Sequence, residues 1–221
     1  MKKEVFSYIF IGCIVFFFCV MLKITLPYFS FRYDVDFLLT KQHVLYLFTW
    51  RLAFYTHISS SLFVLLLGGV QFSQTLLLKK PKIHRLCGKI YVGLVLFVSA
   101  PSGLIMGFYA NGGWAAKTSF VIISVLWWYF TFVAYRKAVR RDLASHLAYM
   151  FRSYALTLSA ITLRMYVLLL PAVIHLHGRE MYTLVAWLSW VPNLMIAEVL
   201  IRKGKLYREV VAADPQISRN R

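Results

Sequence analysis

The stretch LAFYTHISSSLFVLLLGGVQFSQTLLL, residues 52–78, continues for 27 positions without an Asp, Glu, Lys or Arg. A helix rises about 1.5 Å per residue and the hydrocarbon core of a bilayer is about 30 Å thick, so about 20 apolar residues cross it. Inside hydrocarbon the backbone must satisfy its own hydrogen bonds, which an α-helix does within one segment. The stretch therefore predicts a transmembrane helix.

Runs of similar length recur along the chain. Hydrophobic residues make up 60% of the sequence and charged residues 15%, whereas soluble domains average about half and about a quarter. One further segment, 146–171, is apolar apart from Arg152 and Arg164. We predict an all-α, polytopic membrane bundle that forms one domain over 1–221. Its six transmembrane helices are expected at about 5–28, 52–78, 86–110, 118–137, 146–171 and 183–201.

The positive charge is unevenly distributed along this pattern. The chain has 25 Lys and Arg against 8 Asp and Glu, a net charge of +17. With the N-terminus in the cytoplasm, 16 of the 25 basic residues fall on the cytoplasmic side, 5 on the outer side and 4 within the spans. This bias follows the positive-inside rule. It predicts that both termini are cytoplasmic, with residues 202–221 as a basic tail.

The charge also indicates what surrounds the protein. Basic loops on the cytoplasmic side favour contact with the anionic lipids of that leaflet. No nucleic-acid-binding motif accompanies the charge, so nucleic acid is not an expected partner. We therefore expect a multi-pass protein of the cell membrane, whose partner is the lipid bilayer.

Common catalytic motifs are absent from the sequence. It contains no phosphate-binding loop, no Gly-x-Ser-x-Gly elbow and no His-Glu-x-x-His zinc helix. His175 and His177 form a weak metal-binding pattern in a predicted external loop, where such histidines are usually solvated. No metal site is predicted, and whether the protein is an enzyme is left open.

Polar residues inside the spans are the candidates for function, because charges and hydrogen-bonding groups are costly in hydrocarbon. The candidate intramembrane site comprises His57, Gln71, Arg164, Asn193 and Glu198. In the second span the small and polar positions from His57 through Gly68 to Gln71 recur at helical spacing and share one face.

The two intramembrane arginines raise different expectations. Arg152 and Glu198 lie at similar depth on adjacent spans, so we expect an ion pair. Arg164 lies about 10 Å below the outer surface by helical rise, with no acid at its depth. Its expected partner is His57, Asn193 or a backbone carbonyl, and the functional alternative is an anion or polar ligand in an outward-facing cavity.

Two histidines begin spans on the cytoplasmic side. His84 and His146 are candidate axial ligands of one b-type haem, with Arg85 and Arg152 near enough in sequence to neutralise its propionates. The small Gly88, one turn after His84, is expected to leave room for a flat macrocycle. The layout is similar to that of cytochrome b561-type proteins. A lipid-phosphate contact, a metal ion and a quinone are the alternatives for this pair.

Several motifs, taken together, resemble one bacterial membrane-protein family. The sequence is similar to the family called domain of unknown function 2306, whose name supplies no activity. The resemblance implies membrane helices and the bacterial inner membrane. The resemblance covers about two thirds of the chain and rests on His57, Gly68-Gly-Val-Gln-Phe72, His84-Arg-Leu-Cys-Gly-Lys-Ile-Tyr91, Leu126-Trp-Trp, Ala134-Tyr-Arg136, His146, Met150-Phe-Arg-Ser-Tyr-Ala-Leu-Thr157, Leu163-Arg164, Trp190-Val-Pro-Asn193 and Glu198.

Three functions remain open at this point. The first is a haem-binding or redox membrane protein. The second is a small-molecule or ion transporter in which Arg152, Arg164 and Glu198 line a pathway, although the sequence suggests neither an inverted repeat nor a pair of broken helices. The third is a structural or accessory subunit whose polar residues only hold helices together.

Overall fold

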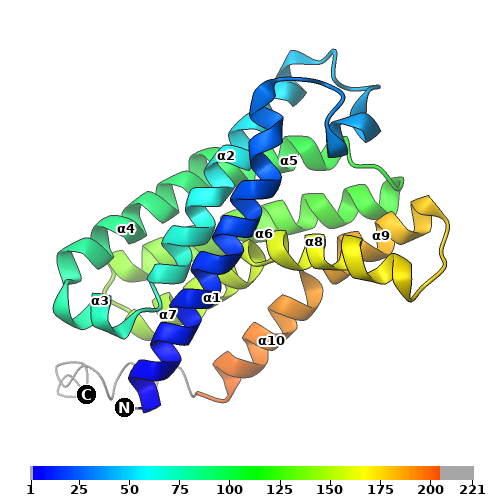
Figure 1. The fold of residues 1–221 in the computed structure, drawn as a ribbon. Coiled ribbons are helices and arrows are strands. Elements are labelled where there is room, and N and C mark those ends of the chain that lie inside the picture. The colour runs from blue at the N-terminus through cyan, green and yellow to red at the C-terminus, as the bar shows by residue number, and fades with distance from the viewer. Residues whose placement is uncertain (1, 205–221) are drawn as a thin grey trace.

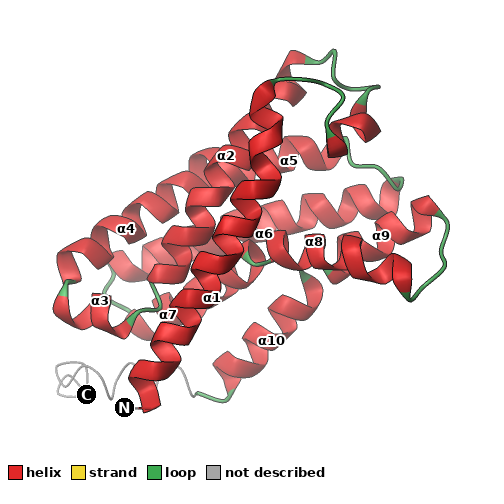
Figure 2. Cartoon of the chain, in the orientation of Figure 1, coloured by secondary structure: helices red, strands yellow, loops and turns green. Residues whose placement is uncertain are grey.

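The computed structural model describes residues 2–204, which form helices and connecting loops and contain no strand (Figures 1 and 2). The predicted basic tail lies almost entirely outside this range. Six helical segments are long and apolar enough to cross a membrane, which confirms the predicted all-α, six-span architecture. They are Gly12–Ser30, Phe48–Val70, Pro81–Phe108, Trp114–Val139, Leu143–Ala172 and Gly178–Arg202.

Four of these spans consist of more than one helical element. In chain order the elements are α1 (Lys2–Thr25), η1 (Leu26–Ser30), η2 (Asp36–Lys41), α2 (Phe48–Val70), α3 (Gln74–Lys79), α4 (Pro81–Leu94), η3 (Val95–Ser99), α5 (Ala100–Phe108), α6 (Trp114–Val139), α7 (Leu143–Thr157), α8 (Ser159–Leu169), η4 (Leu170–Ala172), α9 (Gly178–Leu188) and α10 (Val191–Arg202).

The second span is shorter than its uncharged run. It begins at Phe48 and ends at Val70, eight residues before the expected end at 78. Two consecutive glycines, Gly68 and Gly69, weaken the helix at this point. Ser73 then starts the short helix α3 by accepting a hydrogen bond from the Leu76 N–H at 3.3 Å. The uncharged run therefore includes a span and the turn that follows it.

Three spans are interrupted near mid-depth. In the third, the segment η3 is a π-helix, and Pro101 follows it closely. Because proline cannot donate to the preceding turn, the helix widens there. The sixth span breaks between Leu188 and Val191, just before Pro192, and the fifth is interrupted at Leu158. The sixth span is therefore broken, whereas the third and fifth spans stay helical through their irregular turns.

The centre of the bundle is a close approach of three helices at Gly68. A Cβ atom at this position would lie 2.5 Å from the Tyr154 ring and 2.7 Å from the Tyr91 ring. The Tyr91 hydroxyl bonds Ser153 at 2.7 Å and Thr157 at 3.0 Å. Only glycine lets α2 pack directly against both rings, and a buried hydroxyl network then joins α4 to α7.

The bundle has two distinct ends. We call the end with the turns at 71–80 and 140–142 the basic end, and the opposite end, covered by residues 26–47, the cap end. The start of α1 and the end of α10 both lie at the basic end, and α10 diverges from α9 (Figure 1). That the basic end is cytoplasmic stays a prediction from charge.

The cap is fastened to the bundle by a buried lysine. Lys41 is only 1% exposed, and its ammonium donates to the Tyr109 carbonyl at 2.6 Å and to the Asn111 side-chain oxygen at 2.8 Å. Burial and the nearby charge of Lys117 lower the pKa of Lys41 to about 8. The cap therefore depends on a cation that is costly to bury.

This depressed pKa predicts a pH-dependent stability. An unfolded lysine has a pKa of about 10.4, so between pH 8 and about 10.4 the unfolded chain holds more protons and stability rises with pH. Below pH 8 Lys41 is charged in both states and its burial cost is fully present. Relative to Lys41→Met, the natural protein should gain on the order of 2 kcal/mol across this window, measured by thermal unfolding in detergent. Parallel pH profiles of the two proteins would contradict this assignment.

Candidate functional site

The sequence-predicted polar residues separate into two groups along the bundle. Near the basic end, Arg152 and Glu198 form the expected ion pair, with Nε to Oε1 at 2.5 Å and a second contact from Nη2 to Oε2 at 2.9 Å. The guanidinium also lies 4.9 Å from the centre of the Tyr149 ring. Both charges are thus compensated, and the pair stabilises the contact between α7 and α10. Glu198 occupies the two parallel N–H donors with which the Arg152 guanidinium would bind another anion.

His84 and Gln71 form a local contact at the same end. The Gln71 amide is oriented so that its nitrogen faces an acceptor and its oxygen faces a donor. In this orientation the nitrogen donates to His84 Nδ1 at 3.1 Å, and the oxygen accepts from the Gly88 N–H at 3.2 Å. A Cβ atom at Gly88 would meet this amide at 3.4 Å. The space that the sequence suggested beside Gly88 for a macrocycle is therefore filled by Gln71.

His146 lies near His84 but is held by a different helix. Its Nδ1 is 2.9 Å from the Ala134 carbonyl, which identifies Nδ1 as the protonated nitrogen in the neutral ring. The two imidazoles interact electrostatically. The structure thus brings the two predicted haem ligands into one neighbourhood, whereas Arg152, one of the two predicted propionate partners, is engaged by Glu198.

Arg164 lies on α8 in the half of the bundle nearer the cap. Its Nη1 donates to the Ala160 carbonyl at 3.1 Å, one turn back along its own helix. In the described part of the chain, no carboxylate lies within ion-pairing distance of this guanidinium. The side chain is partly buried and interacts electrostatically with His57 and with the buried Tyr28. Among the described residues, Arg164 is therefore a cation in a membrane span that no carboxylate compensates.

His57 reaches from α2 to the widened turn of the third span. Its Nδ1 donates to the Ser99 carbonyl at 2.9 Å. The ring passes Gly103, where a Cβ atom would lie 3.0 Å from His57 Cε1. The π-helical turn and the glycine together fix the position of this imidazole.

Hydrogen-bonding groups on the same face of α2 are unsatisfied. Trp50 is 1% exposed, and its indole N–H has no hydrogen-bond partner among the described residues; neither has the buried hydroxyl of Ser61. Ser59 and Ser60, by contrast, each donate to a carbonyl four residues back at 2.7 Å. Trp50, His57 and Ser61 recur at helical spacing and share a face.

The Asn193 side chain forms hydrogen bonds at the break of the sixth span. Its amide donates to the Ser189 carbonyl at 3.2 Å and to the Thr162 hydroxyl at 3.1 Å. Thr162 donates to the same Ser189 carbonyl. Carbonyls freed by the break are thus satisfied by side chains, and Asn193 joins the fifth span to the sixth instead of contacting Arg164.

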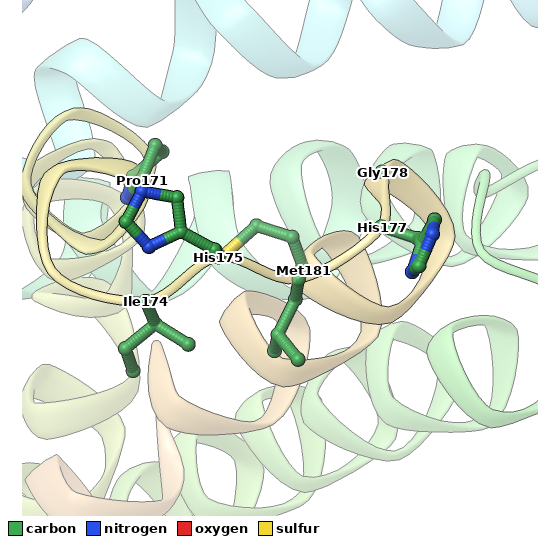
Figure 3. A pocket seen from close by; sticks show the side chains of 7 residues that line it. Pro171, Ile174, His175, His177, Gly178 and Met181 are labelled. Atoms are coloured by element: carbon green, nitrogen blue, oxygen red, sulfur yellow. The ribbon is translucent and has the colours of Figure 1, made fainter.

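The two histidines of the loop before α9, His175 and His177, do not converge on one point. His175 and His177 line a shallow hollow with Met181, and Figure 3 shows the His177 ring directed away from His175 and Met181. His177 is almost fully exposed and lies 3.8 Å from Glu180. No group of three or more His, Cys, Asp or Glu suited to a metal occurs among the described residues.

Comparison with known proteins gives one match. The sequence model of a family described as "Predicted membrane protein (DUF2306)" matches residues 54–201. The chain belongs to this family. No curated protein and no solved structure matches the chain. Membership in DUF2306 agrees with the six spans and leaves the activity open.

Several polar groups that organise this DUF2306 protein were missed in the sequence. The Thr131 hydroxyl bonds Ser153 at 2.7 Å and the Trp127 indole donates to Thr157 at 3.1 Å, which extends the network around Tyr91. Each residue alone is ordinary for a membrane helix. Helical periodicity in the sequence places these residues on spans. Only the packing of α4, α6 and α7 shows that their side chains meet.

The ion pair near the basic end makes a stability prediction. Glu198→Leu leaves Arg152 uncompensated and should lower the free energy of unfolding by about 1–3 kcal/mol, less than for a fully buried pair because Glu198 is 33% exposed. Arg152→Met combined with Glu198→Leu should recover most of the loss. Asp34→Asn, which breaks an exposed pair with Arg32, is the control and should change the melting temperature little. A double variant as unstable as Glu198→Leu would contradict the pairing argument.

Proposed function

We propose that this DUF2306 protein binds a small anionic molecule within the cap half of its bundle and carries it across the membrane. Arg164 would bind the negative charge. The observation that carries the proposal is this guanidinium, which lies in the membrane with no carboxylate partner in the described chain. An intramembrane cation of this kind is costly unless a ligand or another charge compensates it.

The interruptions of the spans support transport rather than binding alone. Substrate sites of many transporters lie near the bilayer midplane, where spans are discontinuous. Here the break in the sixth span and the interruption in the fifth are joined by Asn193, whose amide contacts Thr162 and the Ala155 carbonyl. The π-helical turn of the third span supplies the carbonyl that His57 binds. Arg164 follows Thr162 by two residues on α8, so the proposed site adjoins the contact between the fifth and sixth spans.

In this proposal the cap controls access to the site. Tyr28 packs edge-on against Phe54, and its hydroxyl accepts a hydrogen bond from the Phe37 N–H of the cap. The same tyrosine interacts with Arg164. Movement of the cap would therefore move Tyr28 and change the surroundings of Arg164, as expected of an outer gate. We also propose that the basic end faces the cytoplasm and anionic lipids of the bacterial inner membrane, because that end collects most of the basic residues.

The anion-binding proposal can be tested by ligand-induced stabilisation. Purified protein in detergent would be melted with benzoate, phosphate or sulfate. At least one of these anions should raise the melting temperature of the natural protein and leave Arg164→Leu unchanged, because the variant lacks the binding cation. Without anion, Arg164→Leu should be at least as stable as the natural protein, since an uncompensated charge has been removed from the membrane.

The control variant for this experiment is Arg85→Leu, an exposed arginine near the basic end that should leave the anion effect intact. Arg164→Lys should retain a weaker effect, because an ammonium keeps the charge without the planar fork. Equal stabilisation of the natural protein and Arg164→Leu by every anion would refute the proposal.

A second candidate function is electron transfer with one b-type haem between His84 and His146. The favouring observation is the Nδ1 contact of His146 with a carbonyl, which is how ligating imidazoles are commonly oriented. Bound haem would supply one-electron chemistry, with a potential set by its axial ligands. The residues do not fit the group in the present arrangement, because Gln71 occupies the space beside Gly88 and bonds His84.

The haem candidate predicts a spectrum and its dependence on three residues. Protein produced with added haem should show a Soret band that His84→Ala and His146→Ala each abolish, while His57→Ala leaves it intact. Gln71→Ala should increase haem uptake, because it clears the space beside Gly88. A colourless protein, or a band unaffected by both histidine variants, would remove this candidate.

A further inference from the structure

We infer that a hollow at the cap end of the bundle binds the headgroup of a zwitterionic phospholipid, one with a phosphate diester and an ammonium group. The hollow has a volume of about 720 Å³ and lies between the first turns of α6 and α9. Its wall includes Arg179, Glu180, Trp114 and Trp187, and we call it the rim hollow. Arg164 does not line it, so the site is distinct from the anion site proposed above.

The rim hollow lies where two membrane spans begin. Trp114 is the first residue of the fourth span, and Arg179 is the second residue of the sixth. Trp114 is large and aromatic, yet it is 83% exposed. Indoles concentrate at the boundary between hydrocarbon and headgroups, because the ring is apolar and its N–H seeks a polar partner. The open side of the hollow therefore faces the headgroup layer, where phospholipids are the most concentrated molecules.

The cation of the rim hollow is positioned by a glycine. A Cβ atom at Gly113 would clash with Arg179 Nη2, so the guanidinium occupies space that only glycine leaves open. The φ of Gly113 is 78°, which also favours glycine. In the part of the chain that the structure describes, no carboxylate lies within ion-pairing distance of Arg179. A phosphate diester carries one negative charge and matches this guanidinium.

Hydrogen bonds between α9 and the start of α6 keep the rim hollow in shape. The Thr183 hydroxyl donates to the Gly112 carbonyl at 3.1 Å, and the Trp187 indole donates to the Ala115 carbonyl at 3.2 Å. Both donors come from α9, and both acceptors belong to the segment that begins α6. The wall that carries Arg179 is therefore fastened to the wall that carries Trp114.

The anion of the rim hollow selects among phospholipids. Glu180 is 63% exposed, and its one ion-pair contact in the described chain is with His177 at 3.8 Å. Its carboxylate attracts an ammonium and repels a second anion. Lys117 lies 5.8 Å from the centre of the Trp114 ring and does not line the hollow. A headgroup with an ammonium beside its phosphate therefore meets an opposite charge at both ends, whereas a glycerol headgroup does so at one.

The experiment measures the affinity of the first bound lipid for the purified full-length protein by native mass spectrometry. The probes are phosphatidylethanolamine and the anionic phosphatidylglycerol with identical acyl chains. Phosphatidylethanolamine should bind at least about 3-fold more tightly, because only its ammonium gains from Glu180. Arg179→Gln should weaken binding of both lipids about 3- to 10-fold, since both present a phosphate diester.

The sharpest variant is Glu180→Gln, because it changes an exposed side chain of the same shape. It should remove the preference for phosphatidylethanolamine and leave phosphatidylglycerol binding undiminished, which a loss of folding would not do. The control is Arg32→Gln, an exposed arginine of the cap, which should bind both lipids as the natural protein does.

Three outcomes would overturn this assignment. They are equal affinity of the natural protein for both lipids, a preference that persists in Glu180→Gln, and unchanged binding in Arg179→Gln. Glycerophosphoethanolamine, the same headgroup without acyl chains, separates the lipid from a water-borne zwitterion. It should bind at least about 10-fold more weakly than the lipid, because it lacks the chains that hold the headgroup at the membrane surface. Equal affinity of the two would exclude a phospholipid as the occupant.

Discussion

The contact of Gly68 with the rings of Tyr91 and Tyr154 sets the spacing of three helices, since a single added methyl carbon would lie 2.5 Å from one ring and 2.7 Å from the other. Close backbone approach is what holds membrane helices together, because lipid offers no hydrophobic driving force between them. At this spacing the Tyr154 hydroxyl reaches the Leu65 carbonyl at 3.1 Å, and the Tyr91 hydroxyl reaches Ser153. The buried network is therefore a consequence of the glycine.

The two halves of the bundle differ in whether their polar groups have hydrogen-bond or ion-pair partners. Towards the basic end, the strong groups have partners: Arg152 binds Glu198, and Gln71 binds His84. Towards the cap, the Arg164 guanidinium has only a carbonyl of its own helix, and the buried polar atoms of Trp50 and Tyr55 have no partner among the described residues. Because unsatisfied polar groups are expensive in hydrocarbon, they are informative where they persist. The asymmetry points to the cap half as the part of the molecule adapted to something other than folding.

Sequence reasoning succeeded where a pattern has a direct physical cause. Span number follows from uncharged length, and the Arg152–Glu198 contact follows from the cost of burying either charge alone. It failed where backbone geometry depends on neighbouring helices. No proline marks the interruption at Leu158, and Pro101 gives no indication whether its helix kinks or widens into a π-turn. The space at Gly88 was also misjudged, because the side chain that fills it comes from another helix.

Arg152 and Arg164 belong to one span and lie 12 residues apart, about 18 Å along a helix. They differ chiefly in what compensates them. If arginine at 164 served only packing, an uncharged residue of similar length would give the same contacts without the cost of an ion in the membrane, since Ala160 receives its one hydrogen bond and already belongs to the α8 helix. Glu198 shows that this bundle can place an acid opposite an arginine where both are structural. No such acid lies near Arg164 in the described chain, and this is the charge that the proposed anion would compensate.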